Sequence, residues 1–148
     1  MIRAATLDDL NALVRIEKNA FNTSIYHLTP RRQFRYLLTK ANAQIWIAML
    51  KGEPCGYIIL LLRKNTQFGR LYSIAVTSDH QGGEIGKALF LHAEKCIKQE
   101  KLNGMILEIR ADNARHLERY IYLGYTIFGR IENYYPDESA CIKLKKVF

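Results

Sequence analysis

Residues 71–91 read LYSIAVTSDHQGGEIGKALFL, and the pattern of this stretch decides the fold class. Its first part is mostly apolar and predicts a strand over residues 70–76. A polar loop with Gly82 and Gly83 follows, and over residues 85–101 the apolar side chains recur at the spacing of a helix. A strand that leads through a loop into an amphipathic helix indicates a sheet packed against helices.

The rest of the chain shows the same two periodicities on both sides of this unit. Further strands are expected at residues 2–5, 44–50, 55–63, 105–110, 125–131 and 141–145, and further helices at 6–21, from Thr29-Pro30 onward, and from Asp112-Asn113 to Gly124. Thr29 is expected to cap its helix through its hydroxyl, with Pro30 at the first helical position. This order predicts an α/β fold, a mixed sheet of about seven strands with about four helices on its two faces, in a single domain over residues 1–148.

The composition excludes several classes of protein. With 148 residues, 49% of them apolar, and only 9 Gly and 3 Pro, the chain is unlike a disordered or fibrous protein. The longest apolar run, residues 57–62, is far shorter than the roughly 20 residues that span a bilayer. No secretory signal is visible, and the cysteines Cys55, Cys96 and Cys141 are predicted to be buried thiols. These features predict a cytoplasmic protein with no membrane partner.

The net charge of +8, from 22 Lys and Arg against 14 Asp and Glu, favours anionic partners. The basic residues lack the layout of a nucleic-acid-binding module, so nucleic acid is not the expected partner, although such a domain is kept as an alternative. Six basic residues form two clusters, Arg31, Arg32 and Arg35, and Lys143, Lys145 and Lys146, and the others are scattered among acidic residues. The arginines are expected to face solvent, with recognition of an acidic peptide or anionic small molecule, or steering of a phosphorylated cofactor, as alternatives.

The loop before the long helix is a candidate anion site. It consists of Gln81, Gly82, Gly83, Glu84, Ile85 and Gly86. A helix N-terminus presents unpaired N–H groups with partial positive charge, and glycine lets the backbone approach a phosphate closely. The loop matches neither a nucleotide-triphosphate loop nor a dinucleotide-binding fingerprint, so a purely structural turn is an equal alternative.

A second group of candidates follows in the chain. Glu108 lies between Leu107 and Ile109 in a predicted strand, so its side chain points to the opposite face of the strand. There it either faces solvent or takes part in proton transfer. Asn113 is expected to cap the next helix. Tyr120 in that helix is either a packed core residue or a functional phenol. The histidines show no metal-ligand spacing, and no metal is expected.

Taken together, these elements resemble the GNAT acetyl-CoA-dependent N-acetyltransferases. The resemblance rests on Ile74-Ala75-Val76, the loop 81–86, Leu107-Glu108-Ile109-Arg110, Asn113, and Tyr120 followed by Leu123-Gly124-Tyr125. It covers most of the chain and is densest from about residue 70 to about residue 135. Within the family, the spacing from Glu108 to Tyr120 and the segment Asn133-Tyr134-Tyr135-Pro136 are most similar to the RimI type, the bacterial ribosomal-protein alanine N-terminal acetyltransferases.

The resemblance implies a mostly antiparallel, splayed sheet that binds acetyl-CoA. The backbone of Ile74, Ala75 and Val76 would pair with the pantetheine like an added strand. N–H groups of residues 81–86 would hold the pyrophosphate, and Asn113 would contact the cofactor.

The resemblance also assigns the chemistry. Glu108 would be the general base for the incoming amine, and Tyr120 the general acid that protonates the departing CoA thiolate. The amine attacks the thioester directly in this family, which requires neither a protein nucleophile nor a metal.

One residue departs from the family motif Gln/Arg-x-x-Gly-x-Gly/Ala. Glu84 occupies the fourth position, where the family has glycine, and its carboxylate would crowd or repel a pyrophosphate. A glutamate is also favourable in the first turn of a helix, so a side chain turned to solvent is the alternative. We expect CoA binding to be weaker but not abolished.

The acceptor is expected to be a primary amine, preferably a protein N-terminal α-amine. An α-amino group has a pKa of about 8 and lysine of about 10.4, so a single carboxylate more readily obtains the neutral α-amine at about pH 7. The loop 132–139, with Tyr134 and Tyr135, is expected to hold the peptide, with an exposed hairpin as the alternative. A small-molecule amine substrate and a degenerate CoA-binding sensor are further alternatives, and both a monomer and a homodimer are compatible with the sequence.

Overall fold

The computed structural model describes residues 1–21, 28–40, 42–63 and 66–148. The seven strands are β1 (Ile2–Ala4), β2 (Ala43–Leu50), β3 (Glu53–Leu61), β4 (Phe68–Val76), β5 (Gly104–Arg110), β6 (Thr126–Ile131) and β7 (Cys141–Val147). The α-helices of the described residues are α1 (Leu10–Ala20), α2 (Arg31–Thr39), α3 (Glu84–Gln99) and α4 (Ala114–Tyr122). Short 3-10 turns over Leu7–Asp9 and Ser78–His80 precede α1 and α3. The predicted order of strands and helices is confirmed.

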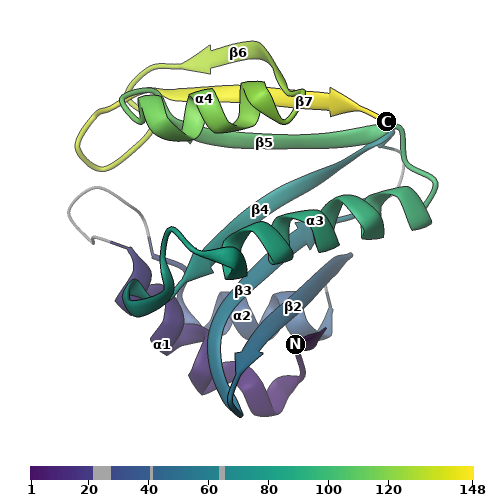
Figure 1. The fold of residues 1–148 in the computed structure, drawn as a ribbon, viewed down its shortest axis with the longest axis vertical. Coiled ribbons are helices and arrows are strands. Elements are labelled where there is room, and N and C mark those ends of the chain that lie inside the picture. Colours follow the sequence, from purple (N-terminus) through teal and green to yellow (C-terminus); the bar gives the residue numbers. More distant parts are fainter. Residues whose placement is uncertain (22–27, 41, 64–65) are drawn as a thin grey trace.

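The sheet is mostly antiparallel and opens in its middle. Its strand order is β1-β2-β3-β4-β5-β7-β6, and only β4 and β5 run parallel to each other. Their ladder joins Phe68–Arg70 to Gly104–Ile106 and extends no further. Beyond it the two strands diverge, which divides the sheet into a half with β1–β4 and a half with β5–β7 (Figure 1). The splayed sheet expected from the resemblance is therefore present.

Strand β3 is buried on both faces, as its continuous apolar run predicted. Tyr57 and Ile59 belong to the core beneath α1 and α2, while Ile58 and Leu60 belong to the core beneath α3. All four side chains are fully buried. The three cysteines are free thiols and are also buried.

The start of α2 differs from the prediction. Pro30 is the N-cap residue and Arg31 the first helical residue, and no side chain caps this helix. The backbone N and Oγ1 of Thr29 instead donate to the carboxylate of Glu17 in α1, each at 2.8 Å. The predicted cap was wrong because the helix begins one residue later than expected, so Thr29 precedes the N-cap residue and its donors bind the buried Glu17 carboxylate.

The start of α4 agrees with the prediction. The Asn113 side chain accepts a hydrogen bond from the backbone N of His116 at 3.1 Å, and Gly124, with φ of 98°, follows the end of the helix. Within the described ranges, no helix combines the length and the apolar character needed to cross a bilayer.

Candidate active site

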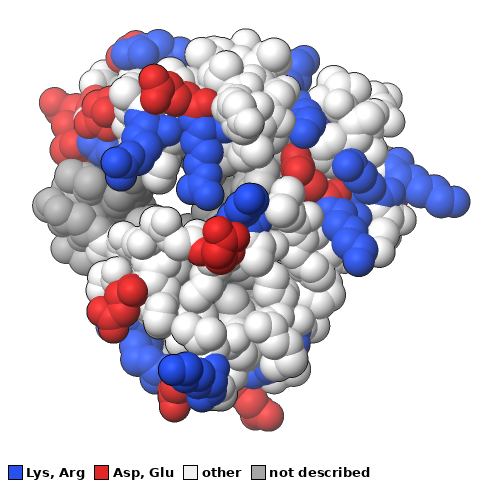
Figure 2. Space-filling model, in the orientation of Figure 1, with Lys and Arg blue, Asp and Glu red and all other residues white. Residues whose placement is uncertain are grey.

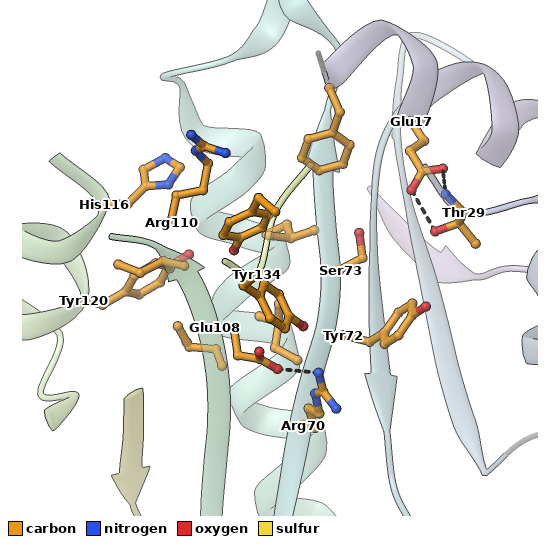
Figure 3. Close-up of a pocket in the computed structure, with 16 residues that line it drawn as sticks. Glu17, Thr29, Arg70, Tyr72, Ser73, Glu108, Arg110, His116, Tyr120 and Tyr134 are labelled. Carbon is orange, nitrogen blue, oxygen red and sulfur yellow. Dashed lines mark hydrogen bonds and ion pairs between the residues drawn. The ribbon is translucent and has the colours of Figure 1, made fainter. Parts of the chain in front are cut away.

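A cavity of about 470 Å³ lies where β4 and β5 diverge. It is lined by side chains of α1, β4, β5 and α4 and of the segment between β6 and β7. Five predicted site residues meet there: Ile74, Glu108, Tyr120, Tyr134 and Tyr135 (Figure 3). The proposed base, the proposed acid and the proposed substrate loop therefore share one space.

Glu108 points into this cavity from β5. Its neighbours Leu107 and Ile109 are buried on the opposite face, and its own side chain is 13% exposed. One carboxylate oxygen forms an ion pair with Arg70 of β4, which the sequence analysis did not identify (Figure 3). The other lies 3.5 Å from Sγ of Cys141. Burial and the Glu108 charge raise the pKa of Cys141 to about 11, so this thiol is neutral and acts as a weak donor.

Tyr120 reaches the same cavity from α4. Its ring packs against Phe90, with the centroids 5.3 Å apart, and against Tyr125 at 6.0 Å. Burial raises the pKa of the Tyr120 phenol, an effect that the nearby Arg119 charge opposes. The phenol is therefore protonated at neutral pH, which is the form that a general acid requires.

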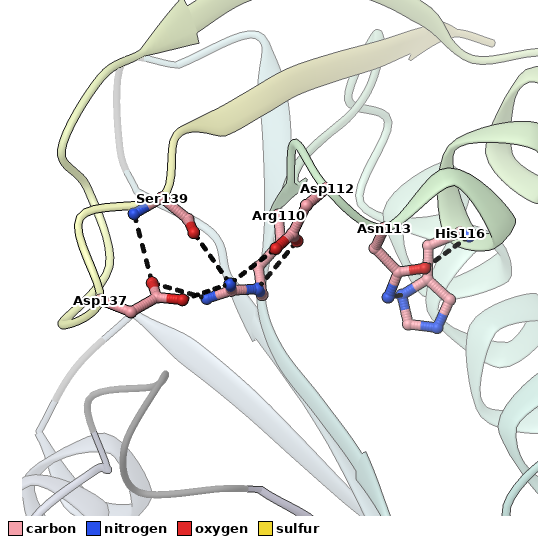
Figure 4. A network of polar contacts seen from close by, with 6 residues as sticks. All are labelled: Arg110, Asp112, Asn113, His116, Asp137 and Ser139. Atoms are coloured by element: carbon pink, nitrogen blue, oxygen red, sulfur yellow. Dashed lines mark hydrogen bonds and ion pairs between the residues drawn. The ribbon is translucent and has the colours of Figure 1, made fainter.

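The loop between β6 and β7 covers one side of the cavity. Tyr134 lies beside Glu108, and burial followed by the Glu108 charge raises the pKa of its phenol (Figure 3). The Tyr134 and Tyr135 rings stand nearly perpendicular, at 86° and 5.0 Å. Buried Arg110 holds this loop, because its Nη2 donates to Ser139 Oγ at 3.0 Å and its guanidinium binds Asp137 (Figure 4). The loop is thus anchored to β5, although most of its residues are exposed.

The candidate phosphate loop lies outside the lining of this cavity. Residues 81–84 are exposed, Gly82 has φ of 78°, and Gly83 is the N-cap residue of α3. The Gln81 side chain donates to the carbonyl of Val76 at 2.9 Å, which fixes the loop against the end of β4. Ala75, Val76 and Asn113 are not among the lining residues either.

The comparisons with known proteins agree with this geometry. The model of the acetyltransferase (GNAT) family matches residues 10–125. The chain belongs to this family. An uncharacterised N-acetyltransferase of Methanocaldococcus jannaschii is 28% identical over 99% of this chain and 91% of its own length. An N-alpha-acetyltransferase of Sulfurisphaera tokodaii is 26% identical over 92% of this chain and 86% of its own.

The fold of this GNAT acetyltransferase is also that of solved RimI-type structures. The crystal structure of the ribosomal-protein-S18-alanine N-acetyltransferase from Escherichia coli superposes with a TM-score of 0.88, at 23% identity, covering 99% of this chain and 92% of its own. The predicted family, fold and enzyme class are confirmed.

Sequence reasoning missed part of the candidate site. Glu17 of α1 lines the cavity although it is only 4% exposed, and burial raises the pKa of its carboxyl. Its position on the apolar stripe of α1, beside Leu13 and Ile16, was the available signal. Conversely, the arginines of α2 are exposed and none lines the cavity.

The surface of the molecule is hollowed near the cavity. Figure 2 shows a depression between the part that carries α4 and the part that carries α3, with both Lys and Arg and Asp and Glu side chains at its rim. Among the described residues, no group of three His, Cys, Asp or Glu side chains is placed to hold a metal ion.

Proposed function

We propose that this GNAT acetyltransferase transfers the acetyl group of acetyl-CoA to a protein N-terminal α-amine, with Glu108 as the base and Tyr120 as the acid. The observation that carries the proposal is the single cavity at the divergence of β4 and β5, which contains both side chains. Acetyl-CoA supplies the activated thioester when it is bound.

Several features of the chain fit acetyl-CoA. Beyond Arg70, β4 has no ladder to β5, so its backbone is available to pair with an extended pantetheine. The loop 81–86 is mostly exposed and opens α3, a 16-residue helix whose N-terminus favours a diphosphate. The left-handed backbone of Gly82 permits close approach of a phosphate.

In the proposed reaction, Glu108 takes a proton from the substrate ammonium, directly or through water. The neutral amine forms a bond to the thioester carbonyl carbon, and the carbon–sulfur bond breaks. Tyr120 gives its proton to the departing CoA thiolate, and the second proton that the nitrogen loses restores the Tyr120 phenol, directly or through water. Because Glu108 is paired with Arg70 in the free enzyme, the substrate has to compete with this arginine for the carboxylate.

Two observations support an α-amine as the acceptor. A carboxylate such as Glu108 is a modest base, and an α-amine with a pKa of about 8 is more easily deprotonated than a lysine side chain. The anchored loop with Tyr134 and Tyr135 faces Glu108 and offers aromatic surface for the first residues of a peptide.

Two measurements test the proposal. Acetyl-CoA should raise the thermal midpoint of the protein, because a ligand that binds only the native state stabilises it. A panel of free amines, lysine side-chain peptides and N-terminal peptides should release CoA thiol fastest with the N-terminal peptides. Equal or faster thiol release with small amines would refute the α-amine as the acceptor. An unchanged thermal midpoint in the presence of acetyl-CoA would refute acetyl-CoA as the donor.

A further inference from the structure

We propose that the sheet face that extends from Glu108 selects protein N-termini whose residues after the first are acidic. The inference rests on the proposed function and specifies its substrate class. It is carried by three cations, Arg70, Lys143 and Lys145, and by the position of the strands that hold them.

The strand registers place these cations on the same sheet face as Glu108. Lys143 of β7 is directly opposite Glu108 of β5, and Lys145 is opposite Ile106. Ile106 is also the register partner of Arg70 in β4. Because residues directly opposite in a sheet share a face, the side chains of all these residues extend toward the same side.

No helix core covers this part of the sheet face. The apolar cluster beneath α1 and α2 draws its strand residues from β2, β3 and β4, and none of its described members belongs to β5, β6 or β7. Helix α3 packs with Leu107 and Ile109, on the opposite face of β5. Figure 1 likewise shows α1 and α2 beside β2 and β3, away from the half of the sheet with β6 and β7.

The two lysines are available for an anionic partner. Neither forms an ion pair with a carboxylate of the described residues. Their ammonium groups lie over the ring of Phe128, at 5.5 Å for Lys143 and 5.4 Å for Lys145, and Phe128 is itself 42% exposed. An exposed aromatic flanked by two cations offers both an apolar contact and charge.

The spacing suits an extended acidic peptide. Lys143 and Lys145 are two positions apart on one strand, a separation of about 6.8 Å, which is also the distance between alternate side chains of an extended peptide. Arg70 is nearest to the proposed chemistry, because it is paired with Glu108. An acidic side chain close to the amine would take Arg70 and leave the Glu108 carboxylate free for the amine.

The test compares two peptides that both begin with serine, so that the reacting amine is the same. One continues with three aspartates and the other with three asparagines. We expect kcat/KM for the acidic peptide to be about tenfold higher, and this preference to shrink when salt rises from about 0.05 to about 0.5 M. Equal values for the two peptides, together with normal thiol release, would overturn the inference and leave the proposed function intact.

A double variant locates the effect. Lys143→Gln with Lys145→Gln should reduce the preference to about twofold or less, measured as the ratio of kcat/KM for the acidic and the neutral peptide in the same variant. The matched control is Lys95→Gln with Lys101→Gln, which removes two exposed charges from and just beyond α3 and should keep the preference. A preference that survives the first double variant, or that falls equally in the control, would contradict the assignment to this face.

Two further readouts separate the remaining outcomes. Calorimetry with the acidic peptide in the presence of CoA measures peptide binding to this sheet face without acetyl transfer. Binding can therefore be detected even if the proposed acetyl transfer does not occur. Free aspartate should be a poor acceptor, because it cannot reach both lysines. Acetylation of aspartate as fast as the acidic peptide would overturn the extended-peptide inference.

Discussion

The guanidinium of Arg110 binds both carboxylate oxygens of Asp137, with Nη2 2.7 Å from Oδ2 and Nη1 3.1 Å from Oδ1. The arginine is buried in β5, and the aspartate lies in the loop that carries Tyr134 and Tyr135. A second acid, Asp112, binds the same guanidinium at 2.9 Å (Figure 4). The position of the loop with Tyr134 and Tyr135 therefore depends on one buried cation.

The Arg110–Asp137 pair predicts how the free energy of unfolding depends on pH. The Arg110 guanidinium lowers the pKa of Asp137 to about 2, below the unfolded value of about 3.9. A lowered pKa stabilises the native state above the unfolded value, and this contribution is lost as the pH falls from about 4 to about 2. Asp137→Asn should remove that part of the pH dependence, measured as the urea midpoint at each pH. Glu138→Gln, next in the chain and also exposed, should retain it.

Substitution of the two proposed catalytic groups should separate binding from turnover. Glu108→Gln and Tyr120→Phe should each slow thiol release about 100-fold or more, while the thermal shift caused by acetyl-CoA stays at the parental size. Glu118→Gln and Tyr122→Phe, two exposed positions of α4, are the controls and should have parental rates. If both catalytic variants turn over as fast as the parent, the assigned roles are wrong.

Glu84 should weaken the binding of CoA. It is exposed in the first turn of α3, where its negative charge opposes a diphosphate on the helix N-terminus. Glu84→Gly and Glu84→Gln should each tighten CoA binding about threefold, measured by calorimetry. Glu53→Gln, an exposed acid at the start of β3, should have no effect. Unchanged or weaker affinity in both Glu84 variants would show that the side chain does not oppose the phosphates.

Thr29 should contribute to stability through Glu17. Thr29→Val removes the hydroxyl donor of a buried carboxylate and should lower the free energy of unfolding by about 1–2 kcal/mol at about pH 7. Burial already raises the pKa of Glu17, so loss of the donor raises it further, and the destabilisation should diminish at about pH 4, where the carboxyl is protonated. Thr39→Val, at the exposed end of α2, should cost less than about 0.5 kcal/mol in the same urea titration.

The sequence predicts the elements of this fold better than their contacts. Period-two and helical patterns located all seven strands and four helices, because these patterns arise within one segment. The Asn113 cap was also correctly predicted, since its partner is three residues away. The Thr29 cap was not, because Glu17 lies 12 residues earlier and its orientation is decided by packing.

In the candidate site, too, the sequence identifies residues but not the contacts between distant ones. Glu108 and Tyr120 stood out through a motif, and the structure places them in one cavity. The Arg70–Glu108 ion pair joins residues 38 positions apart and follows from the parallel pairing of β4 with β5, which no local pattern reveals. Arg110 stood in a recognised motif, but its partner Asp137 is 27 residues away, in the β6–β7 loop.

The three-residue ladder between β4 and β5 has a further consequence. Each additional residue pair would add backbone hydrogen bonds and bring the two halves of the sheet closer, so a longer ladder would make the protein more stable. It would also occupy the backbone edge that the cofactor is proposed to use. Variants selected for heat resistance alone should therefore tend to lengthen the β4–β5 ladder and lose activity. Thermal stability and activity would then oppose each other at this one pair of strands.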